Sequence, residues 1–276
     1  MGKRQISGFS IKEENRLREN LALVDLVIEV LDARLPVTSR NPRLRKMLGS
    51  KRRIIVLNKT DLAEQEITGY WLNFLAGEWP VLAFNAKRKA DIIRMERLLE
   101  SLRPRSTRFK RPFRLMVVGI PNVGKSTIIN RLVQKSAART GNTPGITRGP
   151  QWIKLRAGWD LLDTPGFLSP FLRNEQSILL LGAIGSLAPG SFDVERAAGW
   201  LVEQFLAREK TTRILLDLYS LEPEIKNCSE IIAGIGKARG CFSKGGEVDI
   251  FKTSQLILSD FRRGILGPIT LERPLQ

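Results

Sequence analysis

The sequence predicts an α/β fold, in which a mainly parallel sheet carries helices on both faces and is followed by a small all-α domain. Up to about Pro170, short runs rich in Val, Ile and Leu alternate with stretches of helical periodicity, as in successive βαβ units. A glycine-rich turn at residues 119–126 joins one such run to a helical stretch, a junction typical of doubly wound sheets. Beyond Pro170 only the helical period remains.

The first part of the chain supplies one half of the predicted sheet. Apolar runs indicate strands over residues 24–32, 53–58 and 80–84. Amphipathic spacing indicates helices over residues 10–22, 41–49, 64–76 and 91–102. Residues 103–112 contain two prolines and no periodic pattern, which predicts a linker. We therefore assign residues 1–102 to one half of an α/β domain that continues after the linker.

The second half of this domain is expected in residues 113–172, and a helical C-terminal domain in residues 173–276. Strands are predicted over residues 113–118 and 159–162, and a helix over 127–133, with a loop at about 138–150. Pro189-Gly190 and Gly245-Gly246 break the helical domain. Its predicted helices span residues 174–187, 193–208, 211–219, 222–239 and 247–263.

The segment Gly119-Ile-Pro-Asn-Val-Gly-Lys-Ser126 matches the phosphate loop G-x-x-x-x-G-K-[ST] between a predicted strand and a predicted helix. Its glycines let backbone N–H groups turn toward phosphate oxygens, and the helix N-terminus adds partial positive charge. Lys125 is placed to reach the β- and γ-phosphates, and Ser126 to coordinate Mg²⁺. The predicted phosphate-binding residues are Pro121, Asn122, Val123, Gly124, Lys125, Ser126 and Thr127.

A second motif, Asn58-Lys59-Thr60-Asp61, follows an apolar strand and predicts which base is bound. The Asp61 carboxylate can accept hydrogen bonds from N1–H and the 2-amino group of guanine, whereas adenine has neither donor. Such a polar mismatch discriminates against adenine by a factor of roughly 10⁴ or more. Asn58 is expected to orient the loop and reach the purine edge, and the Lys59 stem to pack along the base.

A third motif, Asp163-Thr-Pro-Gly166, follows the strand at residues 159–162. Asp163 is expected to hold Mg²⁺ through water, and the Gly166 N–H to sense the γ-phosphate. Thr147, in the loop that lies between the phosphate loop and this third motif, is the candidate hydroxyl that closes on Mg²⁺. For Arg148 beside it two interpretations stay open, namely charge for the transition state and contact with RNA.

The order of the motifs indicates a circular permutation. Ras-like chains begin with the phosphate loop and end with N-K-x-D, whereas here Asn58 precedes Gly119. Permutation of one sheet is tolerated because domain termini often lie close together. It also attaches D-T-P-G directly to the helical domain, so release of Gly166 on γ-phosphate loss is expected to reorient residues 173–276.

On these motifs, their order and Asp32-Ala-Arg34 after the first strand, the chain resembles the circularly permuted GTPases of the YlqF/RbgA family. The resemblance implies a P-loop GTPase that hydrolyses GTP to GDP and phosphate, coupled to binding and maturation of the large ribosomal subunit. It implies GTP/GDP and Mg²⁺ as ligands.

The resemblance also assigns residues. The family's second guanine-contacting segment, S-A-K, is here Asn85-Ala86-Lys87, in which the Ala86 N–H would bind guanine O6. Asn122 implies a K⁺ ion near the β- and γ-phosphates, with a role in fixing the loop turn as the alternative. The residues assigned to catalysis are Lys125, Asn122, Thr147 and Gly166.

Two departures concern the attacking water. The family's His after a Gly near the start is here Phe9, and the chain contains no histidine. The position after D-x-x-G, where Ras-like proteins carry Gln, is Phe167. Turnover is therefore expected to be slow without a ribosomal partner. The alternative function is a GTP-gated rRNA- or ribosome-binding module with residual hydrolysis. A GTPase of tRNA modification would need a second cofactor site, for which the sequence offers no candidate.

Charge points to a polyanionic partner. Residues 1–172 carry 32 Lys/Arg and 15 Asp/Glu, whereas residues 173–276 carry 13 of each, so the first part holds the whole net charge of +17. This predicts contact with rRNA mainly through the GTPase domain. Solvated basic loops and a membrane surface are the alternatives, and the sequence has no aromatic amphipathic anchor for the latter.

The remaining features favour a cytoplasmic protein that is monomeric off the ribosome. No apolar run approaches the roughly 20 residues that span a bilayer. The first 20 residues lack the apolar core of a signal peptide, and an organellar matrix or stroma would require a removed import signal. Cys228 and Cys241 are expected to be reduced thiols.

Overall fold

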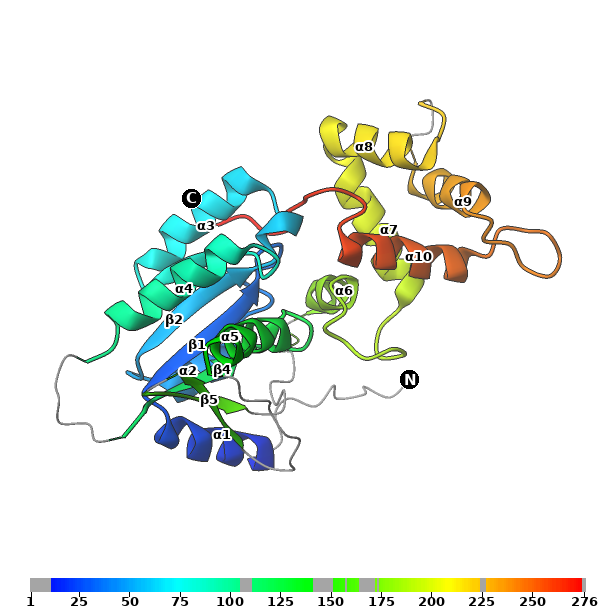
Figure 1. Ribbon diagram of the computed structural model, residues 1–276. Coiled ribbons are helices and arrows are strands. Elements are labelled where there is room, and N and C mark those ends of the chain that lie inside the picture. Colours follow the sequence, from blue (N-terminus) through cyan, green and yellow to red (C-terminus); the bar gives the residue numbers. More distant parts are fainter. Residues whose placement is uncertain are drawn as a thin grey trace. The chain divides into compact units, whose positions relative to one another are not determined.

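The computed structural model describes residues 11–104, 111–140, 151–156, 158–163, 172, 174–223 and 227–274. The chain divides into two compact units, of which the first comprises Met1–Phe171 with Glu272–Gln276 and the second Leu172–Leu271. Figure 1 labels most elements of both units. The sequence-based division placed residues 272–276 in the helical domain, and the structure groups them with the first unit instead.

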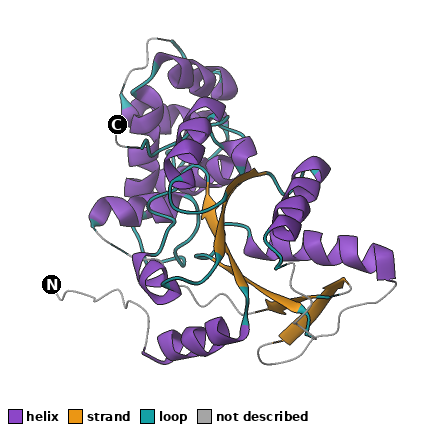
Figure 2. Ribbon diagram, turned by 90° about the vertical axis from the view of Figure 1, so that its left-hand side faces the viewer, coloured by secondary structure: helices purple, strands orange, loops and turns teal. Residues whose placement is uncertain are grey.

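The first unit contains a six-stranded sheet in the order β3-β2-β1-β4-β6-β5, whose twist is visible in Figure 2. The strands are β1 (Leu26–Asp32), β2 (Arg53–Asn58), β3 (Val81–Phe84), β4 (Phe113–Val118), β5 (Gln151–Arg156) and β6 (Trp159–Asp163). All neighbouring strands are parallel except β5, which pairs antiparallel with β6 at the edge. Every residue of β1 and β2 is buried, as expected for central strands covered on both faces.

Helices follow most strands of this unit. They are α1 (Ile11–Leu23), α2 (Pro42–Leu48), α3 (Gln65–Ala76), α4 (Lys89–Ser101) and α5 (Lys125–Thr140), with a 3₁₀ turn at Thr60–Leu62. The helix α3 packs its Ile67, Trp71 and Leu75 against Ile55 and Leu57 of β2. This packing fixes the strand that ends at Asn58, the first residue of the base-recognition motif.

The second unit is helical. It contains α6 (Glu175–Ala183), α7 (Val194–Leu206), α8 (Glu209–Tyr219), α9 (Cys228–Ala238) and α10 (Ile250–Arg263). In four of these helices an Asn or Asp side chain accepts a hydrogen bond from a backbone N–H of the first turn, which satisfies one orphan donor. Those N-caps are Asn174, Asp193, Asn227 and Asp249. Cys228 and Cys241 are free thiols, and no described helix is long and apolar enough to span a bilayer.

Three element predictions were wrong. The strand β5 was missed, because an edge strand that alternates Trp152 and Lys154 with apolar residues lacks the continuous apolar run of the central strands. The helix α5 continues to Thr140, since no glycine or proline interrupts it before Gly141. The helix α9 begins only at Cys228, after its Asn227 cap, rather than at residue 222.

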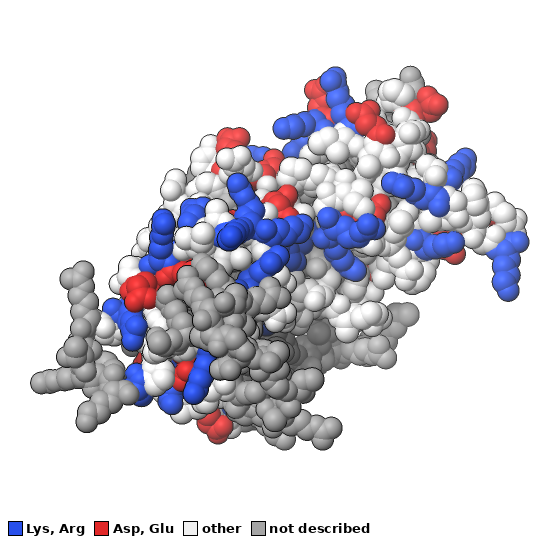
Figure 3. Space-filling view, viewed as in Figure 1, with Lys and Arg blue, Asp and Glu red and all other residues white. Residues whose placement is uncertain are grey.

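Exposed basic side chains follow one another at the start of α4. Lys87, Arg88 and Lys89 are exposed, and so are Arg94 and Arg97 further along the helix. In the view of Figure 3, Lys and Arg predominate over acidic side chains on the described part of the first unit.

Candidate nucleotide-binding site

The phosphate loop connects β4 to α5 through backbone conformations that favour glycine. Gly119 and Gly124 have φ values of 153° and 101°, and Asn122 lies in the left-handed region at φ 61°. A Cβ atom at Gly119 would lie 2.5 Å from the Val30 carbonyl oxygen, and one at Gly124 2.1 Å from Asn58 Nδ2. The surrounding structure and the backbone conformation therefore favour glycine at both positions of the motif.

The base-recognition motif contacts this loop directly. Asn58 Nδ2 donates a hydrogen bond to the Val123 carbonyl oxygen at 2.8 Å. Lys59 Nζ donates to the Asn122 carbonyl oxygen at 2.5 Å. Two segments separated by more than 60 residues in the sequence thus meet at the carboxyl ends of parallel strands, where ligands bind in doubly wound sheets.

A buried ion pair fixes Lys59. Asp32 Oδ2 lies 3.0 Å from Lys59 Nζ, and both carboxylate oxygens of Asp32 accept from the Arg34 guanidinium at 2.9 Å. Asp32 and Arg34 are fully buried. Burial alone would raise the pKa of Asp32, yet the charges of Arg34 and Lys59 hold that pKa well below its usual range.

Asp32 and Arg34 were predicted only as part of the family resemblance, and the contact of Asp32 with Lys59 was not predicted. The available signal was an Asp and an Arg two residues apart at the end of a buried strand, where an unpaired charge would be costly.

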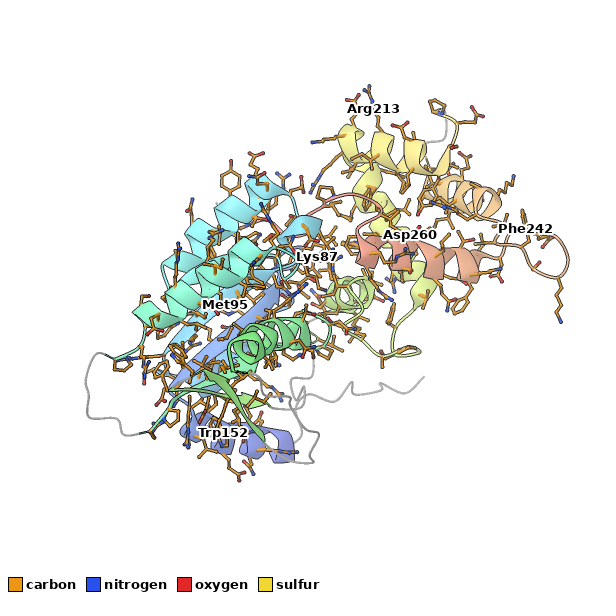
Figure 4. All side chains as sticks on the ribbon, in the orientation of Figure 1. Lys87, Met95, Trp152, Arg213, Phe242 and Asp260 are labelled. Atoms are coloured by element: carbon orange, nitrogen blue, oxygen red, sulfur yellow. The ribbon has the colours of Figure 1, made fainter. Side chains whose placement is uncertain are left out.

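The segment Asn85-Ala86-Lys87, which is predicted to contact guanine, lies beside Asp61. The Lys87 ammonium is 2.8 Å from Asp61 Oδ2, and the position of Lys87 is labelled in Figure 4. Asn85 Oδ1 accepts from the Lys87 backbone N–H at 2.9 Å, and the Asn85 N–H donates to Asp91 Oδ2 at 2.9 Å. The Asn85 side chain therefore shapes this turn, as Asx turns commonly do.

Lys125 is folded back over the phosphate loop. Its Nζ donates to the Ile120 carbonyl oxygen at 2.7 Å. Burial lowers the pKa of Lys125 to about 8. Ser126 and Thr127 are exposed in the first turn of α5. An anionic phosphate at this helix N-terminus would favour the charged form of Lys125, since opposite charges stabilise each other.

These residues fit a guanine nucleotide with Mg²⁺. Asn58 Oδ1 is buried and has no hydrogen-bond partner among the described residues, which leaves an orphaned polar atom in the motif predicted to bind the base. Asp61 and Ser126 supply a carboxylate and a hydroxyl of the expected kinds. Within the described part of the chain no three His, Cys, Asp or Glu residues are grouped so that they could hold a metal ion.

Several predicted residues lie outside the described residues. These are Phe9, Thr147, Arg148, Gly166 and Phe167. Asp163 ends β6, next to the phosphate-loop strand β4 in the sheet, and its backbone alone is described.

Comparison with known proteins gives the relationship. Residues 13–172 match the family described as RsgA GTPase, and residues 114–238 match the family described as 50S ribosome-binding GTPase. Over 97% of its length the chain is 35% identical to Ribosome biogenesis GTPase A of Bacillus cereus, of which it covers 92%. The corresponding Bacillus licheniformis protein is 36% identical, with 97% of this chain and 96% of the relative covered.

The fold is likewise similar to that of GNP-bound YlqF from T. maritima, with a TM-score of 0.68 and 28% identity over 95% of this chain and 98% of that one. The chain therefore belongs to the ribosome biogenesis GTPase A family.

Proposed function

We propose that the protein binds guanine nucleotides at the carboxyl ends of β2, β3 and β4, hydrolyses GTP to GDP and phosphate, and acts in maturation of the large ribosomal subunit. The observation that carries the proposal is the direct contact of the base-recognition motif with the phosphate loop, through Asn58 on Val123 and Lys59 on Asn122. The two motifs thereby form one site.

Within this site each residue has a chemical role. Asp61 accepts the N1–H and 2-amino donors of guanine, and the Ala86 N–H donates to O6. The Lys59 stem packs along the base while its ammonium stays on Asn122 and Asp32. The backbone N–H groups of residues 121–127 surround the β-phosphate, and Lys125 moves from the Ile120 carbonyl to the β- and γ-phosphates.

Hydrolysis requires positive charge beside the γ-phosphate and a water molecule that is oriented for attack. Mg²⁺, which neutralises charge developing on the phosphates, would be held by Ser126, Thr147 and Asp163. The Gly166 N–H senses the γ-phosphate, and Asn122 would hold a K⁺ ion that acts as an arginine finger does. With Phe9 and Phe167 at the positions that carry His or Gln elsewhere, turnover by the isolated protein is slow.

The ribosomal partner is inferred from charge and from the relatives. The matched family is described as a 50S ribosome-binding GTPase, and the curated relatives are named for ribosome biogenesis. The exposed basic side chains from Lys87 to Arg97 supply a surface suited to the phosphates of rRNA. We place the principal rRNA contact on this surface of the first unit.

The experiment is GTP turnover by the purified protein, alone and with large ribosomal subunits, in K⁺ and in Na⁺ buffers. Lys125→Met is the inactive reference. Strong stimulation by subunits supports the proposal, and stimulation confined to K⁺ supports the ion site at Asn122. Nucleotide binding without turnover under any condition would instead favour the GTP-gated binding module. Failure to bind GDP or GTP would overturn both.

The surface assignment has its own test. Arg94→Glu with Arg97→Glu should weaken co-sedimentation with large subunits, and it should do so less at high salt, where screening already weakens the contact. The matched control is Lys237→Glu with Lys252→Glu, which reverses two charges in the helical unit. Equal losses in both variants would contradict a contact made mainly by the first unit.

A further inference from the structure

The last described residues of the chain are hydrogen-bonded to the nucleotide-binding unit. In the C-terminal tail, defined as residues 272–274, the Glu272 carboxylate accepts from the backbone N–H groups of Val37 at 2.7 Å and Thr38 at 3.0 Å. It also accepts from the Thr38 hydroxyl. The Trp71 indole donates to the Glu272 carbonyl oxygen at 3.0 Å. Charge-assisted bonds of this kind are among the stronger ones in proteins.

The segment that Glu272 contacts closes over the end of β1. In this loop, residues 35–39, Ser39 Oγ accepts from the Asp32 N–H at 3.1 Å and donates to the Leu35 carbonyl oxygen at 2.5 Å. The Leu35 N–H donates to the Asp32 carbonyl oxygen at 2.9 Å. The loop therefore fixes the backbone of Asp32 from both its N–H and its C=O.

Asp32 in turn determines where Lys59 lies. Its carboxylate contacts the Lys59 ammonium, which donates to the Asn122 carbonyl oxygen of the phosphate loop. Glu272 is thus connected to the phosphate loop by hydrogen bonds that the covalent chain of residues 35–39, Asp32 and Lys59 links in series. This series ends on the same Lys59–Asn122 contact that carries the proposed function.

We propose that Glu272 is a positioning residue for the guanine-nucleotide site, acting through residues 35–39 and Asp32 on Lys59. The inference rests on the proposed function. Because binding free energies are reciprocal, a tail that strengthens nucleotide binding is itself held more firmly when nucleotide is bound. The backbone links the helical unit Leu172–Leu271 to the nucleotide-binding unit at both of its ends. Of these two links, the C-terminal tail is the one that we expect to be held more firmly when nucleotide binds.

The test uses the full chain and a fluorescent GDP analogue. Glu272→Ala should raise the dissociation constant about 5- to 30-fold, within the usual range of coupling between sites. Glu272→Gln, which keeps one acceptor oxygen, should recover part of the loss. The matched control is Glu209→Ala, because Glu209 is an exposed carboxylate paired with Arg213 inside the helical unit. An unchanged dissociation constant for Glu272→Ala would overturn the inference.

A double-mutant cycle distinguishes an effect of Glu272 on the position of Lys59 from a general destabilisation of the nucleotide-binding unit. In a Lys59→Met background, Glu272→Ala should change the dissociation constant less than about twofold, because its effect passes through Lys59. A full effect in that background would refute the route. If Glu272→Ala fails to fold, hydrogen exchange of the Val37 and Thr38 amides in the unmodified protein decides, with slower exchange expected on GDP binding and equal exchange against the inference.

The two proposals fail differently. If the unmodified protein does not bind the GDP analogue, the proposed function fails. If it binds and Glu272→Ala binds equally well, only the role of Glu272 is lost.

Discussion

The nucleotide-binding unit and the helical unit place charge in their interiors very differently. Among the described residues, the first unit buries five charged side chains, namely Glu29, Asp32, Arg34, Arg53 and Asp91, whereas the second buries one, that of Asp260. Buried ion pairs rarely add net stability over well-packed apolar residues. Asp32 and Arg34, at the carboxyl end of β1 beside Lys59, are therefore best understood as setting the geometry of the site, while the helical unit depends on caps and apolar packing.

The substitution Asp32→Asn is the strongest test of this difference between the two units. The change removes the negative charge between Arg34 and Lys59, and the buried Arg34 guanidinium loses this counter-charge. We expect the free energy of unfolding of the nucleotide-binding unit to fall by about 3–5 kcal/mol, measured by urea denaturation of the full chain. Glu100→Gln is the control, because the exposed Glu100 and Arg103 are 3.9 Å apart and such surface pairs contribute at most about 1 kcal/mol. Equal losses would remove the distinction.

A second prediction concerns the phosphate loop. In Gly124→Ala the new methyl group would lie against Asn58 Nδ2 in a backbone conformation at φ 101°. We expect affinity for GDP to fall at least about 100-fold, which corresponds to about 2.7 kcal/mol. Gly69→Ala in α3 is the matched control, since a Cβ there meets nothing within 4 Å. It should leave affinity unchanged and stabilise the helix by about 0.5–1 kcal/mol.

The third prediction concerns a buried hydrogen bond in the helical unit. Tyr219 is buried and its hydroxyl donates to Asp260 Oδ2 at 2.9 Å. Tyr219→Phe deprives a buried carboxylate of this donor and should lower the free energy of unfolding by about 1–3 kcal/mol. Tyr70→Phe, which removes an exposed hydroxyl from Glu66, should have little effect.

The same pair predicts a pH dependence. Burial, and then the hydrogen bond and charge of Asp260, raise the pKa of Tyr219 above its ordinary value. The folded state therefore favours the neutral phenol. Its contribution is complete below the ordinary tyrosine pKa of about 10 and is lost as the pH rises above it. The dependence should vanish in Tyr219→Phe.

The smallest expected effect is a proton taken up at Lys125. With a pKa of about 8 in the free protein, about half of the molecules hold a neutral Lys125 amine at pH 8, and a bound phosphate restores the charge. Calorimetry in buffers of different ionisation enthalpy should report uptake of about half a proton on GDP binding. Lys125→Met should show none of this uptake. Without nucleotide, the contribution of Lys125 to stability should rise between pH 8 and 10.5, because the unfolded chain retains the proton longer.

Much of the nucleotide-binding unit could be predicted because its elements carry local signals. The glycines of the phosphate loop, the apolar runs of β1, β2 and β4, and the strand–loop–helix order are short-range patterns. The fold class and the family were confirmed for that reason. The roles of the individual site residues stay predictions, and for Thr147 and Gly166 the structure describes no geometry.

What the sequence did not predict depends on contacts between distant residues. Nothing local to Asp32 reveals that Lys59 lies 3.0 Å away, because Asp32 ends β1 whereas Lys59 directly follows the neighbouring strand β2. Nothing local to Glu272 distinguishes it from a solvated terminal residue, since its partners are Val37, Thr38 and Trp71. The edge strand β5 was missed because its pairing with β6 comes from the hairpin rather than from its own composition.

The contact between Lys87 and Asp61 has a consequence for the proposed selection of guanine. Lys87 is 75% exposed, so the pair is worth at most about 1 kcal/mol and opens readily. In this pair the Asp61 carboxylate, which is predicted to select guanine, has a counter-charge supplied by its own chain. A guanine that displaces the Lys87 ammonium would donate two N–H hydrogen bonds to the carboxylate in its place. An adenine that displaces it would donate none. In the proposed site a base would therefore compete with Lys87 for Asp61, and we expect this competition to disfavour bases that lack the two donors of guanine.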